Sequence, residues 1–267
     1  MLTEQGIKRY IKSDIDIIFL EESPSTNLEA KKIAATAREG TVIFARRQLS
    51  GRGRIGRSFE SPEGGIYMTM LVRPTDPVCL TMAAAVAVRR AMVDKLNLDP
   101  AIKWVNDIYW EGKKVCGILA EGALCKNELR YAAVGVGLNY QSPVFTGGLS
   151  AKAGSLYPDS QPPVSIDEMA AAMADQLYKA LTNPSEPSIY REYRASSMLT
   201  GKRVVLMREG EPEATAIDVT PEGHLIVRFD DGCTEELYSG EVSVRAAEYP
   251  HLSLIHISEP TRQAEIS

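Results

Sequence analysis

The sequence has few of the residues that build disulfide frameworks, zinc sites or histidine-based catalytic centres. Its 267 residues include 4 cysteines and 3 histidines. The cysteines are Cys79, Cys116, Cys125 and Cys233. Because no two of them form a C-x-x-C pair, they argue against a disulfide scaffold or a zinc site and are typical of reduced thiols in a cytoplasmic protein. The histidines are His224, at an expected turn, and His251 and His256, near the C-terminus, which argues against a Ser–His–Asp or Cys–His mechanism.

Long apolar runs and an excess of positive charge are also missing. The longest purely apolar run, residues 82–88, is too short to span a bilayer, and residues 1–12 have no signal-peptide apolar region. The formal net charge is −5 and the pI is near 5.4, whereas a protein with a broad nucleic-acid-binding surface is normally basic. We therefore expect no membrane and no nucleic-acid partner. The 44% apolar composition can bury a full core, with room for a large domain and a small one.

Positive charge is concentrated in one stretch, residues 46–59, which contains five arginines and three glycines and is called the arginine loop below. Residues 41–45 and 64–72 on either side are apolar and rich in strand formers, so both are expected strands. Glycine lets a backbone approach a ligand closely, and arginine supplies paired donors for phosphate or carboxylate oxygens. The pattern predicts a loop between two strands that binds a small anion.

Three other interpretations compete for this loop. Gly51, Gly53 and Gly56 match the G-x-G-x-x-G dinucleotide fingerprint, but that site needs a helix opening at the glycines, and here a strand follows. A kinase glycine loop does lie between strands, yet the H-R-D and D-F-G partners are absent. On these residues alone, a solvated charged hairpin tip stays open as an alternative.

The residues before position 200 alternate between expected strands and helices. We expect strands at 15–20, 101–107 and 131–140, and a hairpin formed by 108–110 and 114–121. We expect helices at 28–35, 77–97, 169–181 and 188–198. Ser165 and Glu168 form a capping box before the third helix. Ser25, Thr26 and Asn27 precede the first, where they either only cap it or also face a ligand.

The character of the sequence changes at Gly201. Short expected strands at 204–206, 214–219, 225–229 and 234–237 are separated by Gly and Asp turns, which predicts a small β-barrel-like domain. Nothing from His251 onward continues this pattern. We place the domains at 1–199 and 200–248, and we expect 249–267 to be an unstructured tail that is either native or an added extension.

Five motifs, in order, resemble those of biotin–protein ligases, the enzymes that attach biotin to a carrier lysine. They are Ser25-Thr26-Asn27; Gln48 followed by Gly51-Arg52-Gly53-Arg54-Ile55-Gly56-Arg57 and Ser61-Pro62; Lys103-Trp104-Val105-Asn106-Asp107; Lys114-Val115-Cys116-Gly117-Ile118-Leu119; and Gly135-Val136-Gly137-Leu138-Asn139. The resemblance covers about residues 15–247. Val105 replaces the family's usual proline, and Phe59 stands where an aromatic residue, often tryptophan, is typical.

The resemblance implies an α+β fold with a mixed central sheet flanked by helices, of the class II synthetase-like, biotin–lipoate ligase type. It also implies that the C-terminal strands form an SH3-like β-barrel. Family members that repress transcription carry an N-terminal winged helix-turn-helix. Because the resemblance starts near Ile15, we expect a short form without that domain and without a repressor role.

The resemblance also assigns roles to individual residues. It implies biotin binding by Ser25, Thr26, Asn27, Gln48, Arg52, Gly53, Arg54, Lys114 and Gly117. It implies nucleotide binding by Arg52, Arg54, Arg57, Asp107 and Asn139. Lys114 and Arg54 would be the catalytic cations, and Asp107 would bind Mg²⁺ together with the nucleotide phosphates.

The implied reaction forms biotinyl-5′-AMP from biotin and ATP with Mg²⁺, then passes biotin to a lysine of a biotin carboxyl carrier protein, such as that of acetyl-CoA carboxylase. Fixed cations suit this chemistry because carboxylate attack on a phosphate brings two anions together. A sheet-edge homodimer is a further expectation.

The alternative function is that of an enzyme that uses lipoate or octanoate on the same fold. Lipoate lacks the ureido group that the polar set from Ser25 to Gln48 would bind, which argues against that alternative. A nucleic-acid-binding module using the arginine loop is opposed by the net acidity.

Overall fold

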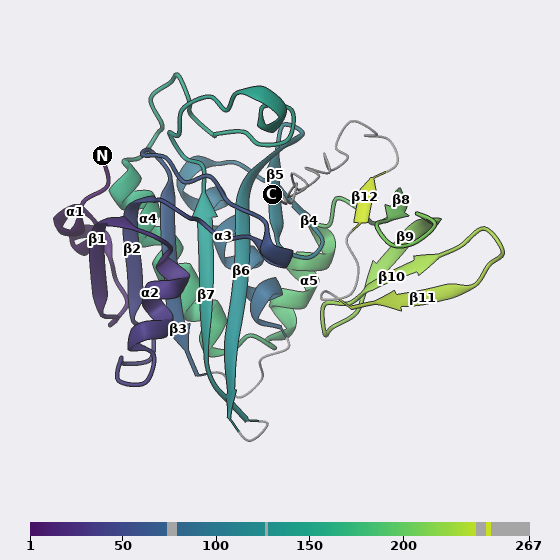
Figure 1. Ribbon diagram of the computed structural model, residues 1–267, viewed down its shortest axis with the longest axis horizontal. Coiled ribbons are helices and arrows are strands. Elements are labelled where there is room, and N and C mark those ends of the chain that lie inside the picture. Colours follow the sequence, from purple (N-terminus) through teal and green to yellow (C-terminus); the bar gives the residue numbers. More distant parts are fainter. Residues whose placement is uncertain (74–78, 126–127, 239–243, 247–267) are drawn as a thin grey trace, which may run out of the picture.

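The structure is a computed structural model that describes residues 1–73, 79–125, 128–238 and 244–246. Its larger part is built on a seven-stranded sheet with the order β1-β2-β3-β7-β6-β5-β4 (Figure 1). The strands are β1 (Ile17–Ser23), β2 (Val42–Gln48), β3 (Ile66–Val72), β4 (Ala101–Lys103), β5 (Asp107–Trp110), β6 (Lys113–Cys125) and β7 (Glu128–Leu138). Strands β1 and β2 are parallel and the other neighbours antiparallel, so the expected mixed sheet is confirmed.

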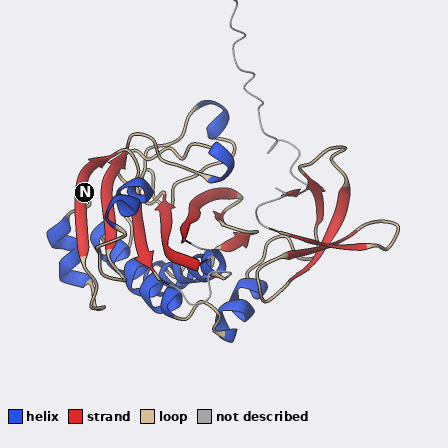
Figure 2. Cartoon of the chain, turned by 60° about the horizontal axis from the view of Figure 1, so that its bottom comes forward, coloured by secondary structure: helices blue, strands red, loops and turns tan. Residues whose placement is uncertain are grey.

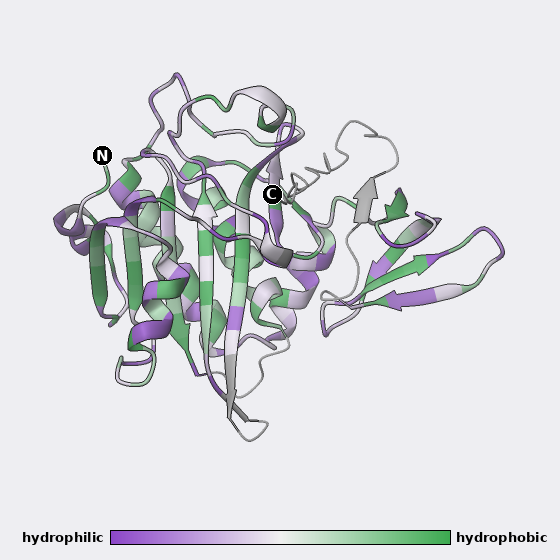
Figure 3. Ribbon diagram, in the orientation of Figure 1, coloured by the Kyte–Doolittle hydropathy of each residue, from purple (hydrophilic) through white to green (hydrophobic). Residues whose placement is uncertain are grey.

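Helices cover both faces of this sheet. Helix α2 (Thr26–Ile33) packs on one face over a small apolar cluster that includes Ile43, Leu71 and Ala133. Helices α3 (Leu80–Leu96) and α4 (Ile166–Thr182) share the main core with the residues of the opposite face. Figure 2 shows the long helices gathered along one side of the sheet, and Figure 3 shows hydrophobic residues running along its strands. The short helices are α1 (Glu4–Tyr10) and α5 (Pro187–Ala195).

The helix boundaries follow their capping residues. The Ser165 hydroxyl accepts a hydrogen bond from the Glu168 N–H at 3.1 Å, so α4 begins at Ile166, three residues before the expected start. Helix α3 ends at Leu96, one residue before the predicted end, and Asn97 caps it in the left-handed conformation (φ 54°). The predicted first turn of α3, at Pro77, lies outside the described residues.

The expected strand at 101–107 is wrong. The chain turns at residues 104–106, so β4 ends at Lys103 and β5 runs back from Asp107. Contacts distant in sequence stabilise this turn: Asn106 exchanges two hydrogen bonds with Ile118, and the Tyr193 hydroxyl donates to the Val105 carbonyl at 3.0 Å.

Helix α1 was not predicted from the sequence. Its seven residues depend on Thr3 for a cap and on Asp167 of α4 to hold that cap in place.

The C-terminal part is a five-stranded antiparallel sheet with the order β11-β10-β9-β8-β12. Its strands are β8 (Arg203–Leu206), β9 (Glu213–Val219), β10 (Leu225–Arg228), β11 (Thr234–Leu237) and β12 (Val244–Ala246). Within the described residues β11 and β12 do not pair, so this sheet is open rather than a closed barrel. The expected tail with His251 and His256 lies outside the described residues, and the domain limits at 199 and 248 stay a prediction.

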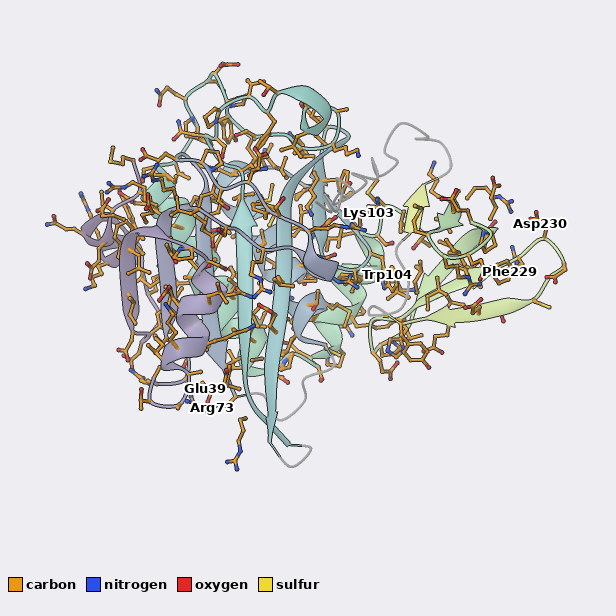
Figure 4. All side chains as sticks on the ribbon, viewed as in Figure 1. Glu39, Arg73, Lys103, Trp104, Phe229 and Asp230 are labelled. Carbon is orange, nitrogen blue, oxygen red and sulfur yellow. The ribbon has the colours of Figure 1, made fainter. Side chains whose placement is uncertain are left out.

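The turn at 104–106 also joins the two sheets. The Trp104 indole N–H donates to the Gly223 carbonyl at 2.9 Å, and Figure 4 shows Lys103 and Trp104 on the side of the large sheet that faces the small one. Helix α5 adds the Arg194–Asp218 ion pair, with contacts of 2.5 and 2.6 Å. The small sheet therefore helps to hold the turn in place.

Asp175 on α4 anchors the segment between α1 and β1. Its buried carboxylate accepts hydrogen bonds from the backbone N–H groups of Lys12 and Ser13 at 2.8–3.1 Å. We expect Asp175→Ala to lower the free energy of unfolding by about 2–3 kcal/mol, because it leaves these donors without a charged partner. Urea denaturation measures this loss. The exposed Asp159→Ala is the control and should change stability by less than about 0.5 kcal/mol; equal effects would contradict the anchor.

Candidate functional site

A pocket opens on the face of the sheet that carries α2, where the ends of β2 and β7 meet the start of β6. Its walls come from the start of α2, the loop after β2, the turn between β4 and β5, and strands β6 and β7. The lining residues are Ser25, Thr26, Asn27, Gln48, Arg52, Gly53, Arg54, Arg57, Ser58, Phe59, Lys103, Trp104, Asn106, Asp107, Lys114, Gly117, Ile118, Leu119, Gly135, Val136 and Gly137. Segments far apart in the sequence thus form one site.

The register of three strands explains how the polar end of this pocket is built. Thr69 on β3, Gly135 on β7 and Leu119 on β6 form one row across the sheet. The Asn27 side chain lies over Gly135, where an added Cβ would come within 2.0 Å of its Oδ1 atom. It reaches Thr69 on one side and the Leu119 carbonyl on the other, at 2.7 and 3.2 Å. Only glycine at position 135 leaves room for this arrangement.

The next row along the strands holds an aromatic ring. Tyr67, Gly137 and Gly117 are neighbours across the sheet, and the Phe59 ring lies over both glycines. Phe59 makes an edge contact with Tyr67, and Lys114 Nζ lies 5.9 Å from the centre of the Phe59 ring. The space left by these two glycines is therefore occupied in part by a side chain of the arginine loop.

The start of α2 carries more than a helix cap. Ser25 is the N-cap residue, but its side chain makes no capping hydrogen bond. The Thr26 backbone N–H donates to Gln48 Oε1 at 2.9 Å, and the Gln48 amide donates to the Ser61 hydroxyl at 2.8 Å. Ser25, Thr26 and Asn27 are all buried. The cap-only interpretation therefore does not account for these residues, whose side chains line the pocket.

The arginine loop folds back on itself as a narrow hairpin. The Gly53 N–H donates to the Arg57 carbonyl at 2.7 Å, and the Phe59 N–H donates to the Gly51 carbonyl at 2.8 Å. Residues Arg54–Gly56 form a single 3₁₀ turn, after which the chain extends again. No helix opens at the glycines, so the dinucleotide fingerprint does not describe this loop.

The opposite end of the pocket is strongly positive. Five cationic side chains of the described residues line the pocket as a whole: Arg52, Arg54, Arg57, Lys103 and Lys114. Four of them gather around Asp107 at this end, whereas Arg52 lies near Glu121. Among the lining residues that the structure describes, Asp107 is the single carboxylate, and its Oδ1 lies 2.6 Å from Lys114 Nζ. Burial, together with the nearby charges of Lys114 and Arg57, lowers the pKa of Lys103 against the opposing effect of Asp107. An anionic ligand would relieve this concentration of positive charge.

The same residues do not form a metal site by themselves. No cluster of three or more His, Cys, Asp or Glu side chains suited to a metal occurs in the described part of the chain. Asp107 is already paired with Lys114, so a Mg²⁺ ion here would depend on phosphate oxygens for most of its ligands, as Mg²⁺ often does. The assignment of Mg²⁺ to Asp107 stays a prediction.

Nearly all residues predicted for the site line this pocket. The exception is Asn139, which lies just beyond β7, is buried, and donates its side-chain N–H to the Gly154 carbonyl at 3.0 Å. Sequence reasoning missed Thr69 and Glu121, which contact Asn27, because nothing marks them in an ordinary strand pattern. Their position in register with Gly135 and Ala133 is visible only once the strands are paired.

The described helices include none with the length and apolar character needed to cross a lipid bilayer. This agrees with the absence of long apolar runs in the sequence.

Comparison with known families identifies two matching regions. A model described as "Biotin/lipoate A/B protein ligase family" matches residues 17–139, and a model described as "Biotin protein ligase C terminal domain" matches residues 200–245. Together they cover well over half of the chain. The first region contains every residue that lines the pocket.

Individual proteins agree with these matches. The chain is 29% identical over 259 residues to "Bifunctional ligase/repressor BirA" of Bacillus spizizenii, covering 91% of this chain and 79% of that protein. It is 34% identical over 153 residues to "Biotin--[acetyl-CoA-carboxylase] ligase" of Paracoccus denitrificans, covering 55% of this chain and 61% of that one. The structure "Biotin protein ligase from Aquifex aeolicus in complex with biotin and ATP" is similar with a TM-score of 0.75 and 26% identity, covering 87% of this chain and 99% of that chain.

Proposed function

Since the chain belongs to the biotin/lipoate A/B protein ligase family, we propose that it is a biotin–[acetyl-CoA-carboxylase] ligase that works in two steps. It first joins biotin and ATP to give biotinyl-5′-AMP and pyrophosphate. It then transfers biotin to a specific lysine of a biotin carboxyl carrier protein, from acetyl-CoA carboxylase or a related carboxylase.

One observation carries the proposal: the pocket has an uncharged polar end and a cationic end. Thr26, Asn27 and Gln48 offer fixed donors and acceptors at the first end, suited to an uncharged ring that both donates and accepts hydrogen bonds. The second end is suited to a carboxylate and phosphates, and it is formed by Arg54 and Arg57 of the arginine loop together with Lys103 and Lys114. Biotin has a cyclic urea at one end and a carboxylate at the other, so it matches this division of the pocket.

In the first step, a biotin carboxylate oxygen bonds to the α-phosphorus of ATP while the bond from that phosphorus to the pyrophosphate oxygen breaks. Lys114 and Arg54 offset the repulsion between the two anions and stabilise the charge on the phosphorus oxygens. Arg52, Gly53 and Arg57 hold the carboxylate and the phosphates. Asn139 lies outside the pocket lining, and its nucleotide-binding role stays a prediction. Asp107 would be the protein ligand of a Mg²⁺ ion bound with the nucleotide phosphates, and such an ion would neutralise charge on the leaving pyrophosphate.

In the second step, the neutral amine of the acceptor lysine attacks the acyl carbon and the bond from that carbon to the phosphate oxygen of AMP breaks. AMP leaves, and the nitrogen releases one proton to solvent as the amide forms. The same cations that held the phosphate then stabilise AMP as the leaving group. An added Cβ at Gly117 would lie 3.1 Å from the Phe59 ring and 3.2 Å from Lys114 Nζ, so glycine at this position leaves room for both side chains beside the reacting carboxylate. A sheet-edge homodimer remains part of the proposal as a prediction.

Pyrophosphate exchange into ATP tests the first step. We expect exchange with the wild-type protein to require biotin, because only biotin supplies both the urea and the carboxylate that the pocket accommodates. Lipoate and octanoate serve as the comparison, since they share the carboxylate and lack the urea. Exchange with lipoate or octanoate, and none with biotin, would reject biotin in favour of the alternative acyl acid; no exchange with any acid would reject adenylation altogether.

A further inference from the structure

Beneath the polar end of the pocket lies a chain of hydrogen bonds that runs from a carboxylate to the wall of the site. It links Glu121 on β6, Asn27 on α2, Thr69 on β3 and Thr26 on α2. Asn27 Nδ2 lies 2.8 Å from Glu121 Oε2, Asn27 Oδ1 lies 2.7 Å from Thr69 Oγ1, and Thr69 Oγ1 lies 2.8 Å from Thr26 Oγ1. Thr69 is fully buried, so it cannot touch a ligand in the pocket itself.

The ionised carboxylate of Glu121 fixes which groups donate and which accept along this series of hydrogen bonds. Lys31 Nζ donates to the other Glu121 oxygen at 2.7 Å. Burial alone would raise the pKa of Glu121, but the hydrogen bonds from Lys31 and Asn27, with the charges of Lys31 and Arg52, hold that pKa below its ordinary value. An ionised carboxylate can only accept, so the Asn27 amide must turn its NH₂ group toward Glu121. Its second N–H donates to the Leu119 carbonyl at 3.2 Å.

The number of protons on each side chain determines the remaining donors and acceptors. With both N–H groups in use, the Asn27 amide presents its oxygen to Thr69, so the Thr69 hydroxyl must donate its single proton to Asn27 Oδ1. Thr69 Oγ1 then has only lone pairs for Thr26, and the Thr26 hydroxyl must donate to it. This hydrogen bond directs the Thr26 proton away from the pocket and toward Thr69. The Thr26 oxygen therefore has a lone pair that can accept a hydrogen bond from a ligand in the pocket.

We propose that Thr69 is a positioning residue that makes the Thr26 hydroxyl an acceptor for a ring N–H of the cyclic urea. This inference rests on the proposed function and deepens it, because it assigns the recognition of the urea's donors to a residue outside the pocket lining. Without the Thr69 hydroxyl, the Thr26 proton is free to turn toward Gln48 Oε1, 3.2 Å away, or toward the ligand. In the second orientation a donor would face the N–H of the urea, and binding would weaken.

The test uses Thr69→Val, which keeps the side-chain shape and removes the hydroxyl, with Thr69→Ser as the variant that restores it. We expect Thr69→Val to raise the KM for biotin in pyrophosphate exchange by about 10- to 100-fold and to leave the KM for ATP within about twofold. Thr69→Ser should return the KM for biotin to within about threefold of wild type. Direct titration of biotin without ATP should show the same ranking of dissociation constants.

Thr41→Val is the matched control, because Thr41 is also buried, directly before β2, and its hydroxyl donates to the Arg38 carbonyl at 2.7 Å, away from the pocket. It removes a buried hydroxyl without touching the chain of hydrogen bonds, so both KM values should stay at the wild-type level. An unchanged KM for biotin in Thr69→Val, an equal rise in the KM for ATP, or a Thr69→Ser variant that resembles Thr69→Val would each overturn the assignment. If the wild type itself shows no biotin-dependent exchange, the proposed function and this inference fall together; if it does and Thr69→Val matches it, the inference alone falls.

Discussion

Replacing Lys114 by methionine is expected to lower kcat/KM for biotin-dependent pyrophosphate exchange by about 10²- to 10³-fold. The change keeps most of the length of the side chain and removes the ammonium group at the cationic end of the pocket. That group lies 2.6 Å from Asp107 and above Gly117, where the biotin carboxylate and the α-phosphate are proposed to meet. Without it, one fixed cation no longer offsets the charge that develops on the phosphorus oxygens.

Two further variants separate the possible causes of this loss. Lys113→Met, at the neighbouring exposed position of the same hairpin, removes an equal charge from a side chain outside the pocket and should leave exchange near the wild-type rate. The double variant Lys114→Met/Asp107→Asn tests whether Lys114 only neutralises Asp107. We expect the double variant to stay at least about tenfold below wild type, because the substrate anions still lack their cation and the proposed Mg²⁺ ligand Asp107 is lost as well. Full recovery in the double variant would contradict a direct role for Lys114.

The motifs of this chain were assigned to one site, whereas the local strand and helix patterns placed some element boundaries wrongly. Ser25-Thr26-Asn27, the arginine loop and Gly117 were assigned to one site from their sequence alone, and the structure brings them into one pocket. Their residue types alone only suggested a ligand nearby, because a glycine in a strand leaves room for close approach and polar residues at a helix start can also be simple caps. The resemblance to the family motifs joined them into one site. The roles assigned to these residues stay predictions.

The errors share one physical cause, which is that contacts distant in sequence decided the local structure. Residues 101–107 have the composition of one strand, yet the chain turns at 104–106 because Ile118, Tyr193 and Gly223 supply hydrogen bonds to that turn. Helix α1 is too short to be stable alone and depends on Asp167 of α4. Thr69 was missed for the same reason, since its importance comes from its register with Gly135 and not from its neighbours in the sequence.

Gly135→Ala is expected to lower the free energy of unfolding by about 2–4 kcal/mol and to raise the KM for biotin by more than about 100-fold. The added Cβ would lie 2.0 Å from Asn27 Oδ1 and 2.9 Å from its Cγ. Asn27 cannot move aside cheaply, because it is buried and its amide is bonded to Leu119, Glu121 and Thr69. Displacing that amide leaves buried groups without partners and releases the hydroxyl of Thr26 from its fixed direction. Urea denaturation and pyrophosphate exchange measure the two effects.

Gly137→Ala gives the matched comparison, two residues along the same strand and on the same face. Its Cβ would meet the Phe59 ring at 2.6 Å, but Phe59 is half-buried on a hairpin loop and can shift, so the stability loss should stay below about 1 kcal/mol. Equal losses at the two glycines would contradict the special constraint at Gly135. A double-mutant cycle then tests the cause directly: in an Asn27→Ala background the obstructing amide is gone, so Gly135→Ala should cost at least about 1 kcal/mol less than in the wild type. Strict additivity would show that the Asn27 side chain is not what makes glycine necessary at this position.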